Sequence, residues 1–163
     1  MNIETVNQLS VDEFIHRFGE IAEHSPWVAE RAASKRPFAT MEAMIEAFAQ
    51  AVMQADPSRQ MALLCAHPDL AGRAKLTEHS AGEQQDAGLD SLSPEEFAAF
   101  TELNTTYQKR FGFPFIFAVK GANKHQILDA FHMRVNNPQA EEFATALAQV
   151  CRILRFRIEA EIT

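Results

Sequence analysis

The chain has 163 residues, of which 47% are hydrophobic and 23% are charged. This length is typical of one domain with a core large enough to fold without disulfides, and the composition excludes a disordered chain. Asp and Glu (22) outnumber Lys and Arg (15), and the net charge of −7 disfavours binding to nucleic acid or to an anionic membrane surface. The chain has neither a secretory signal nor the ~18 consecutive apolar residues of a spanning helix. We therefore expect a cytoplasmic protein.

Helix signals recur along the first part of the chain. Ser10 and Glu13 have the spacing of a capping box and open a stretch with apolar residues at helical spacing. Ser-Pro and Asp-Pro pairs mark two further helix starts, and a stripe of apolar residues marks another helix between them. These signals predict helices over residues 11–24, 27–34, 41–55 and 57–66.

The second part of the chain continues the pattern. Ser80 with Glu83 and Ser93 with Glu96 have capping-box spacing, and the second pair opens a long helix that stops at Gly112. A helix over 123–135 and a last one after Asn137-Pro138 follow. Between them, residues 113–119 form one short apolar segment that reads as extended. The sum is an all-α fold, a single compact domain over 1–163 with seven or eight helices.

The loop-like segments over 35–40, 66–80 and 111–123 carry the polar residues of interest. His67 stands where the fourth helix must end before Pro68, so the negative end of the helix dipole favours a protonated imidazole that can donate a proton. A histidine that only closes a helix explains the same position. Both interpretations stay open.

The sequence from Ser80 to Gln84 also has two interpretations. Its capping box satisfies backbone N–H groups and requires no ligand. Alternatively, Glu83 and Gln84 place a carboxylate and an amide side by side at a helix N-terminus, which suits a urea-like or amide substrate.

Arg157 is the C-terminal arginine that periodicity directs towards the core. At 100° per residue it shares a face with Val150 and Phe143, whereas Arg152 points nearly opposite. A buried guanidinium needs a partner. The partner is either an internal carboxylate such as Glu83 or Asp69, or an anionic or carbonyl-rich ligand.

Motifs for other chemistries are absent from the sequence. It has no zinc-ligand spacing, Walker loop, dinucleotide-binding glycine motif or nucleophile elbow. These absences disfavour a metal site, ATP or NAD binding, and serine hydrolysis.

Several segments, taken together, resemble one enzyme family. They are Leu64 to Gly72 (containing His-Pro-Asp-Leu-Ala-Gly), Leu76-Thr77, Ser80 to Leu89 (beginning Ser-Ala-Gly-Glu-Gln), Leu103-Asn104 with Tyr107, and Phe111 to Ile116 (Phe-Gly-Phe-Pro-Phe-Ile). The chain resembles the 2-oxo-4-hydroxy-4-carboxy-5-ureidoimidazoline (OHCU) decarboxylases over essentially its whole length. The resemblance implies an all-α homodimer that needs no cofactor and converts OHCU to (S)-allantoin and CO2 in urate degradation.

The resemblance also implies roles for particular residues. His67 is expected to be the catalytic acid or base, with Glu83 and Arg157 as the other catalytic residues. Arg157 lies in Phe-Arg-Ile where the family has Leu-Arg-Leu, and its neighbour Arg155 is the alternative arginine. The substrate-binding residues implied are Pro68, Ser80, Ala81, Gly82, Glu83, Gln84, Phe115, Ile116, Phe117, Ala118, Val119 and Arg157.

A rival hypothesis assigns a different class of function. The chain would be a non-catalytic helical binding module that keeps a pocket for a ureide or purine catabolite. The two hypotheses differ in whether His67, Glu83 and Arg157 face one cavity and carry out turnover.

Overall fold

In a computed structural model, which describes residues 1–72 and 76–163, the regular secondary structure is entirely helical. Nine helices and no strand occur in those ranges, which confirms the all-α fold class. The chain divides into two compact units: unit 1 is Met1–Ala66 with Val150–Thr163, and unit 2 is His67–Gln149. A single domain over 1–163 stays a prediction.

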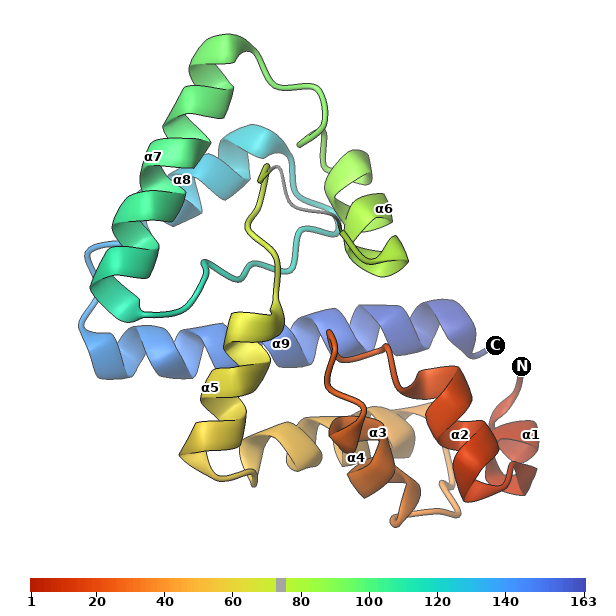
Figure 1. The fold of residues 1–163 in the computed structure, drawn as a ribbon. Helices are drawn as coiled ribbons and strands as arrows, with labels where there is room; N and C mark the ends of the chain where they lie inside the picture. Colours follow the sequence, from red (N-terminus) through yellow and green to blue (C-terminus); the bar gives the residue numbers. More distant parts are fainter. Residues whose placement is uncertain (73–75) are drawn as a thin grey trace. The chain divides into compact units, whose positions relative to one another are not determined.

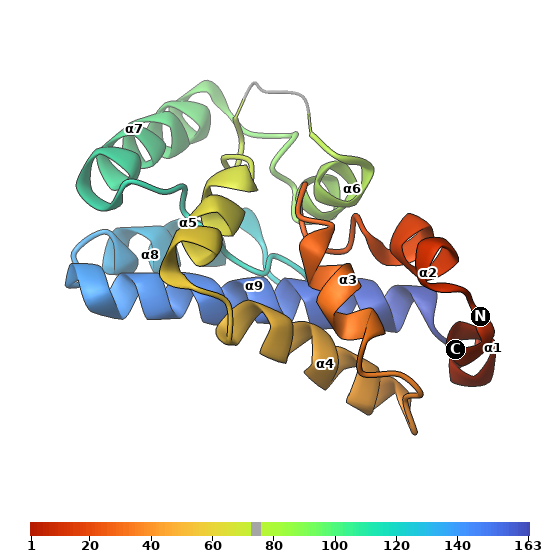
Figure 2. The same cartoon turned by 60° about the horizontal axis from the view of Figure 1, so that its bottom comes forward.

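Unit 1 contains five complete helices and the C-terminal part of a sixth. They are α1 (Ile3–Gln8), α2 (Val11–Phe18), α3 (Trp27–Ala33), α4 (Met41–Met53), α5 (Pro57–Ala66) and the end of α9 (Gln139–Glu161). The predicted capping box of Ser10 and Glu13 opens α2. Helix α3 packs against both α2 and α4 (Figure 2). The rings of Phe14, Phe18 and Phe48 lie in this core and are fully buried.

Two details at the start of unit 1 differ from the sequence-based expectations. The helix predicted over 11–24 ends at Phe18, because Gly19 follows and the chain turns through His24 at a φ of 44°. Helix α1 was not predicted, and it takes the number of helices above the expected seven or eight. Val6 is its one buried residue, so the helix has no apolar periodicity to read.

Unit 2 contains α6 (Glu78–Asp86), α7 (Pro94–Phe111), α8 (Lys124–Arg134) and the first part of α9. As predicted, Ser93 and Glu96 form the capping box of α7, and Gly112 ends the helix in the left-handed region at a φ of 79°. Helices α7 and α8 lie side by side (Figure 1), and the rings of Phe100 and Phe131 meet between them at 6.3 Å.

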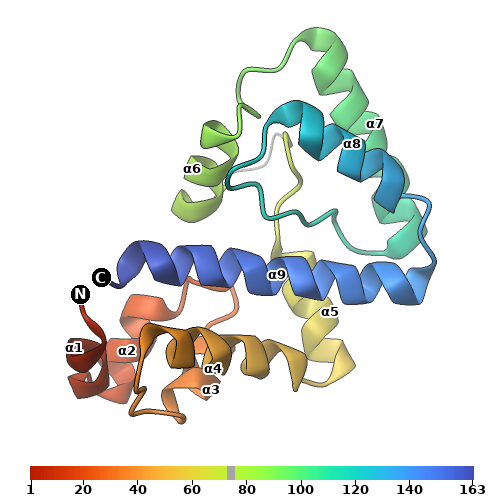
Figure 3. The same cartoon turned by 180° about the vertical axis from the view of Figure 1, so that it is seen from behind.

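The two ends of the chain meet within unit 1. The backbone N–H of Thr163 donates to the carbonyl of Met1 at 2.9 Å, and both termini lie side by side in Figure 3. No helix in residues 1–72 and 76–163 has the length and apolar character needed to cross a membrane.

Candidate active site

His67 is the first residue after α5, as the sequence predicted. Pro68 disfavours further helix at this point, so the chain leaves the helical path with the imidazole at the break. The side chain is buried, with 8% of the residue exposed, and its Nε2 atom is fully enclosed. The ring is therefore held by protein rather than projecting into solvent.

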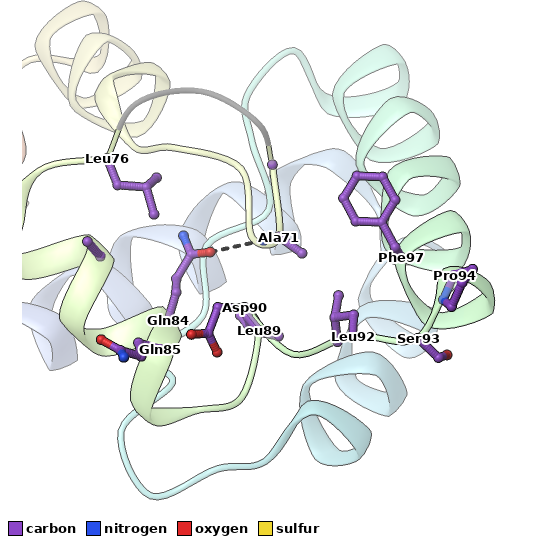
Figure 4. Close-up of a pocket in the computed structure, with 12 residues that line it drawn as sticks. Ala71, Leu76, Gln84, Gln85, Leu89, Asp90, Leu92, Ser93, Pro94 and Phe97 are labelled. Atoms are coloured by element: carbon purple, nitrogen blue, oxygen red, sulfur yellow. Dashed lines mark hydrogen bonds between the residues drawn. The ribbon is translucent and has the colours of Figure 1, made fainter.

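The segment after His67 and Pro68 is tied to α6 by the side chain of Gln84. The Gln84 amide accepts a hydrogen bond from the N–H of Ala71 at 3.0 Å and donates one to the carbonyl of Asp69 at 3.2 Å. Figure 4 shows the first of these bonds. Gln84 was predicted to bind substrate amides. In the structure both ends of its amide hold the backbone of the neighbouring segment, and a substrate role for it stays a prediction.

Helix α7 holds the same segment from a second side. Asn104 donates from Nδ2 to the carbonyl of Leu70 at 2.9 Å, and Gln108 donates to the carboxylate of Asp69. Burial raises the pKa of the Asp69 carboxyl above its ordinary value, and the hydrogen bond from Gln108 offsets part of that rise.

Two cavities border residues 69–72. One has a volume of about 770 Å³ and is lined from α6, α7 and the connection between them; its walls include Ala81, Gln84 and Phe97 (Figure 4). The other has a volume of about 440 Å³ and is lined mainly by α7, including Asn104 and Gln108. Ala71 and Gly72 line both cavities.

Helix α6 begins earlier than the sequence indicated. Its N-cap is Thr77, whose hydroxyl accepts from the N–H of Ser80, so the predicted capping box of Ser80 and Glu83 is wrong. The spacing matched a box, but the helix has already passed its first turn at Glu83. Ser80 and Gln84 lie one turn apart on the buried face, and Gly82 and Glu83 are partly exposed.

The apolar segment over 113–119 forms neither helix nor strand and joins α7 to α8. Its backbone is held at two alternate residues: Arg134 donates to the carbonyl of Ile116 at 2.6 Å, and the N–H of Ala118 donates to Gln149 at 2.9 Å. Among residues 115–119 only Phe117 has a partly exposed side chain. The predicted substrate contacts from this segment stay a prediction.

Behind this segment lies a buried charged network that the sequence analysis missed. Glu142 is fully buried and accepts from Arg134 Nε at 2.7 Å and from the Tyr107 hydroxyl at 2.5 Å. Burial, reinforced by the neighbouring Glu142 carboxylate, raises the pKa of Tyr107. The sequence does contain a signal for the burial of Glu142, because this residue precedes Ala146 and Val150 at four-residue spacing on the apolar stripe of α9.

Arg157 is the buried arginine of α9, as periodicity predicted; 3% of it is exposed. Its Nη2 lies 2.9 Å from Oε1 of the buried Glu23, and its Nη1 donates to the carbonyl of Ile21 at 3.0 Å. The internal carboxylate is thus Glu23 rather than the expected Asp69, and a contact between Arg157 and Glu83 stays a prediction. Arg155 instead pairs with Glu42 at 2.5 Å through side chains that are both partly exposed.

Unit 2 brings together most of the predicted site residues. His67, Pro68, the stretch from Ser80 to Gln84 and the segment over 115–119 all belong to it, whereas Arg157 belongs to unit 1. Convergence of His67, Glu83 and Arg157 on one cavity stays a prediction. Within the described ranges no three His, Cys, Asp or Glu side chains are grouped so that they could hold a metal ion.

An imidazole and a carboxylate, such as those of His67 and Glu83 in unit 2, are the side chains that most often act as general acids and bases in enzymes. Comparison with known proteins identifies the enzyme family. A family model described as OHCU decarboxylase matches residues 7–159. The chain therefore belongs to the OHCU decarboxylase family.

Individual relatives agree with this assignment. The chain is 46% identical to a 2-oxo-4-hydroxy-4-carboxy-5-ureidoimidazoline decarboxylase of Haloferax volcanii, over 97% of this chain and 94% of the relative. It is 38% identical to the uric acid degradation bifunctional protein PucL of Bacillus subtilis, over 99% of this chain but 33% of that longer protein.

Solved structures share the fold. A crystal structure of (S)-allantoin synthase superimposes with a TM-score of 0.80 at 30% identity, covering 99% of this chain and 54% of that one. The chain thus spans just over half the length of that protein. An OHCU decarboxylase crystallised in the presence of (S)-allantoin superimposes with a TM-score of 0.73 at 22% identity, over 87% of this chain and 94% of that one, which shows a shared fold.

Proposed function

We propose that this chain catalyses the cofactor-independent decarboxylation of OHCU to (S)-allantoin and CO2, a step of urate degradation. The observation that carries the proposal is the family membership over residues 7–159, together with a relative of that name at 46% identity over nearly the whole of both chains. The enzyme is a carboxy-lyase whose substrate is a small molecule.

The chemistry needs no separate electron sink. The carboxylate of OHCU is attached to a ring carbon that also bears a hydroxyl and lies next to a C=N bond. When the carbon–carboxylate bond breaks, its electron pair forms a ring C=C bond, and the C=N electrons move onto the ring nitrogen, which takes up a proton. A proton then adds to the carbon that bears the ureido group, and the hydroxyl loses its proton as the carbonyl of allantoin forms. Overall, one proton is taken up and one CO2 leaves.

Within this reaction His67 is the group we propose to move a proton. An enclosed imidazole at a fixed helix end suits general acid–base catalysis, which contributes about 10²–10⁴-fold. Proton delivery to one face of the ring carbon explains a single enantiomer of the product. We propose that Pro68 and the apolar residues over 115–119 form a dry wall on which the carboxylate loses solvent.

We propose Glu83 and Arg157 as polar residues that contact the substrate. Glu83 is partly exposed, and we propose that its carboxylate accepts hydrogen bonds from the N–H groups of the ureido substituent or the ring. Gln84 already bonds the backbone of residues 69 and 71, so we propose that its main role is to hold the segment that follows Pro68 in place. Arg157 has its charge balanced by Glu23 and would offer hydrogen bonds to the substrate rather than net positive charge. We also propose a homodimer located in the cytoplasm.

The experiment that tests the proposal is a circular-dichroism time course of freshly generated OHCU with and without the protein. We expect the (S)-allantoin signal to appear faster with the protein, and His67→Ala to lose that acceleration while its melting temperature stays close to that of the parent chain. His125→Ala is the matched control, because His125 is exposed on α8. No acceleration over spontaneous decay would favour a non-catalytic module, and full activity in His67→Ala would remove His67 from the mechanism.

A further inference from the structure

The three residues after His67 and Pro68 are each held by a carboxamide side chain from another helix. Gln84 of α6 bonds the carbonyl of Asp69 and the N–H of Ala71, and Gln108 of α7 bonds the Asp69 carboxylate. Asn104 of α7 bonds the carbonyl of Leu70 at 2.9 Å across 34 residues of sequence. We call Gln84, Asn104 and Gln108 the carboxamide clamp.

The backbone in the clamp adopts a conformation that needs support. Ala71 has a φ of 57°, in the left-handed region that residues with a Cβ rarely adopt. Such a residue persists where its surroundings over-determine it. Leu70 and Ala71 are both buried, with 7% of each exposed, and cavities of about 770 and 440 Å³ also border Ala71. The hydrogen bonds of the clamp act together with this packing to hold the backbone of the segment in place.

The burial of the Asn104 side chain lowers the stability of the fold. The residue is 7% exposed, and its Oδ1 atom is buried and accepts no hydrogen bond from the described residues. A buried polar atom without a partner destabilises a fold, and an apolar side chain of the same size avoids that cost. What asparagine adds here is the single donor to the Leu70 carbonyl.

We propose that Asn104 is a positioning residue for the reaction, acting through the backbone of residues 69–71 to hold His67 and Pro68 against the substrate. The inference rests on the proposed function, since it requires His67 to be catalytic. Loss of the bond to Leu70 lets the segment relax by a fraction of an ångström or more. A misplacement of about 1 Å costs a rate of about 10²-fold.

The test compares Asn104→Ala and Asn104→Asp with the parent chain by steady-state OHCU decarboxylation. Asn104→Asp keeps the shape of the side chain but, when ionised, cannot donate to the carbonyl. We expect kcat to fall about tenfold to a hundredfold in both variants with KM within about twofold, the signature of a group that acts on the transition state. The loss in Asn104→Asp should shrink as the pH falls, because a protonated carboxyl donates again, whereas the loss in Asn104→Ala should not.

Thr105→Ala is the matched control. Thr105 is the next residue of α7, is exposed, and bonds only the carbonyl of Thr101 in its own helix among the contacts the structure gives it. Its kcat and KM should match the parent chain. A folded Asn104 variant with parental kcat, or one whose KM rises as much as its kcat falls, would overturn the proposal.

Two further comparisons keep the outcome decisive. If neither Asn104 variant folds, Gln108→Ala replaces them, because Gln108 is exposed and releases only the Asp69 end of the clamp. A threefold to tenfold loss of kcat is then expected, and an unchanged kcat rejects the inference. Parallel assays of the parent chain and His67→Ala separate the two proposals, since failure of the proposed function removes activity from the parent chain itself.

Discussion

The ion pair of Arg157 and Glu23 lies buried in unit 1, where loss of either side chain is expected to cost stability. Both residues are almost completely buried, with 3% and 1% exposed, and their charged atoms lie 2.9 Å apart. Removing charges from water costs several kcal/mol for each ion, and a close partner offsets much of that cost. Breaking such a pair leaves a buried charge uncompensated.

We therefore expect Arg157→Met to lower the free energy of unfolding by about 3–5 kcal/mol. Arg152→Met on the same helix is exposed and should change it by less than about 0.5 kcal/mol. Urea denaturation of both variants measures the difference. The double variant Glu23→Leu with Arg157→Met should recover most of the loss, and a single variant as stable as the parent chain would contradict the energetic role of the pair.

The burial of Arg157 could be predicted from the sequence, but its partner could not. Helical periodicity fixes the direction in which a side chain leaves its own helix. Glu23 lies 134 residues away in a turn region with no periodic pattern. The same limit applies to the hydrogen bond between Asn104 and Leu70. A bond from a helix to an irregular segment produces no periodic pattern of residues in either segment.

Helix α6 shows how one local pattern can fit two starting points. Thr77 and Ser80 are both good N-cap residues, and the structure selects Thr77. The earlier start places Gly82 in the middle of the helix, with open space around the position of an added Cβ. No steric reason therefore requires a glycine at this position, and a glycine in a helix interior lowers the stability of the helix.

We expect Gly82→Ala to stabilise the protein by about 0.8–1.0 kcal/mol, because alanine is the better helix former in a helix interior. Under the proposed function the new methyl group lies in the stretch assigned to the substrate, so KM should rise severalfold. Thermal unfolding and steady-state kinetics on the same preparation separate the two effects. A more stable variant with parental KM would place the substrate away from this position.

Most of the other helices follow directly from the sequence, and the exceptions have a common cause. The starts of α2, α7 and α8 carry capping residues that bond as expected. Helix α1 is short and buries one side chain, so it lacks the apolar stripe on which a prediction depends. Of the candidate site, His67 at its helix end was predictable, whereas the carboxamide clamp depends on contacts between distant segments.

At the scale of the whole molecule, unit 1 is discontinuous in sequence and unit 2 is continuous. The two chain ends lie in unit 1 and are joined by the hydrogen bond from Thr163 to Met1. Ends this close can be linked by a short flexible peptide, and exposed loops tolerate new termini.

We expect a circular permutant with a Gly-Ser linker from Thr163 to Met1, opened between Asp90 and Ser91, to fold and to keep OHCU decarboxylation within a few fold of the parent rate. Asp90 and Ser91 are exposed between α6 and α7. A second permutant opened between Leu70 and Ala71 cuts the clamped segment and should lose activity. Equal activity of the two permutants would show that the path of residues 69–71 has no catalytic importance.

The division of unit 1 between the two ends of the chain has a consequence during synthesis on the ribosome. Residues Met1–Ala66 emerge first, but the carboxylate of Glu23 meets its arginine only after 134 further residues have been made. The residues of unit 2 emerge as one uninterrupted stretch, so formation of its core does not depend on residues 150–163. We therefore expect the first helices to be translated to be among the last to reach their final packing.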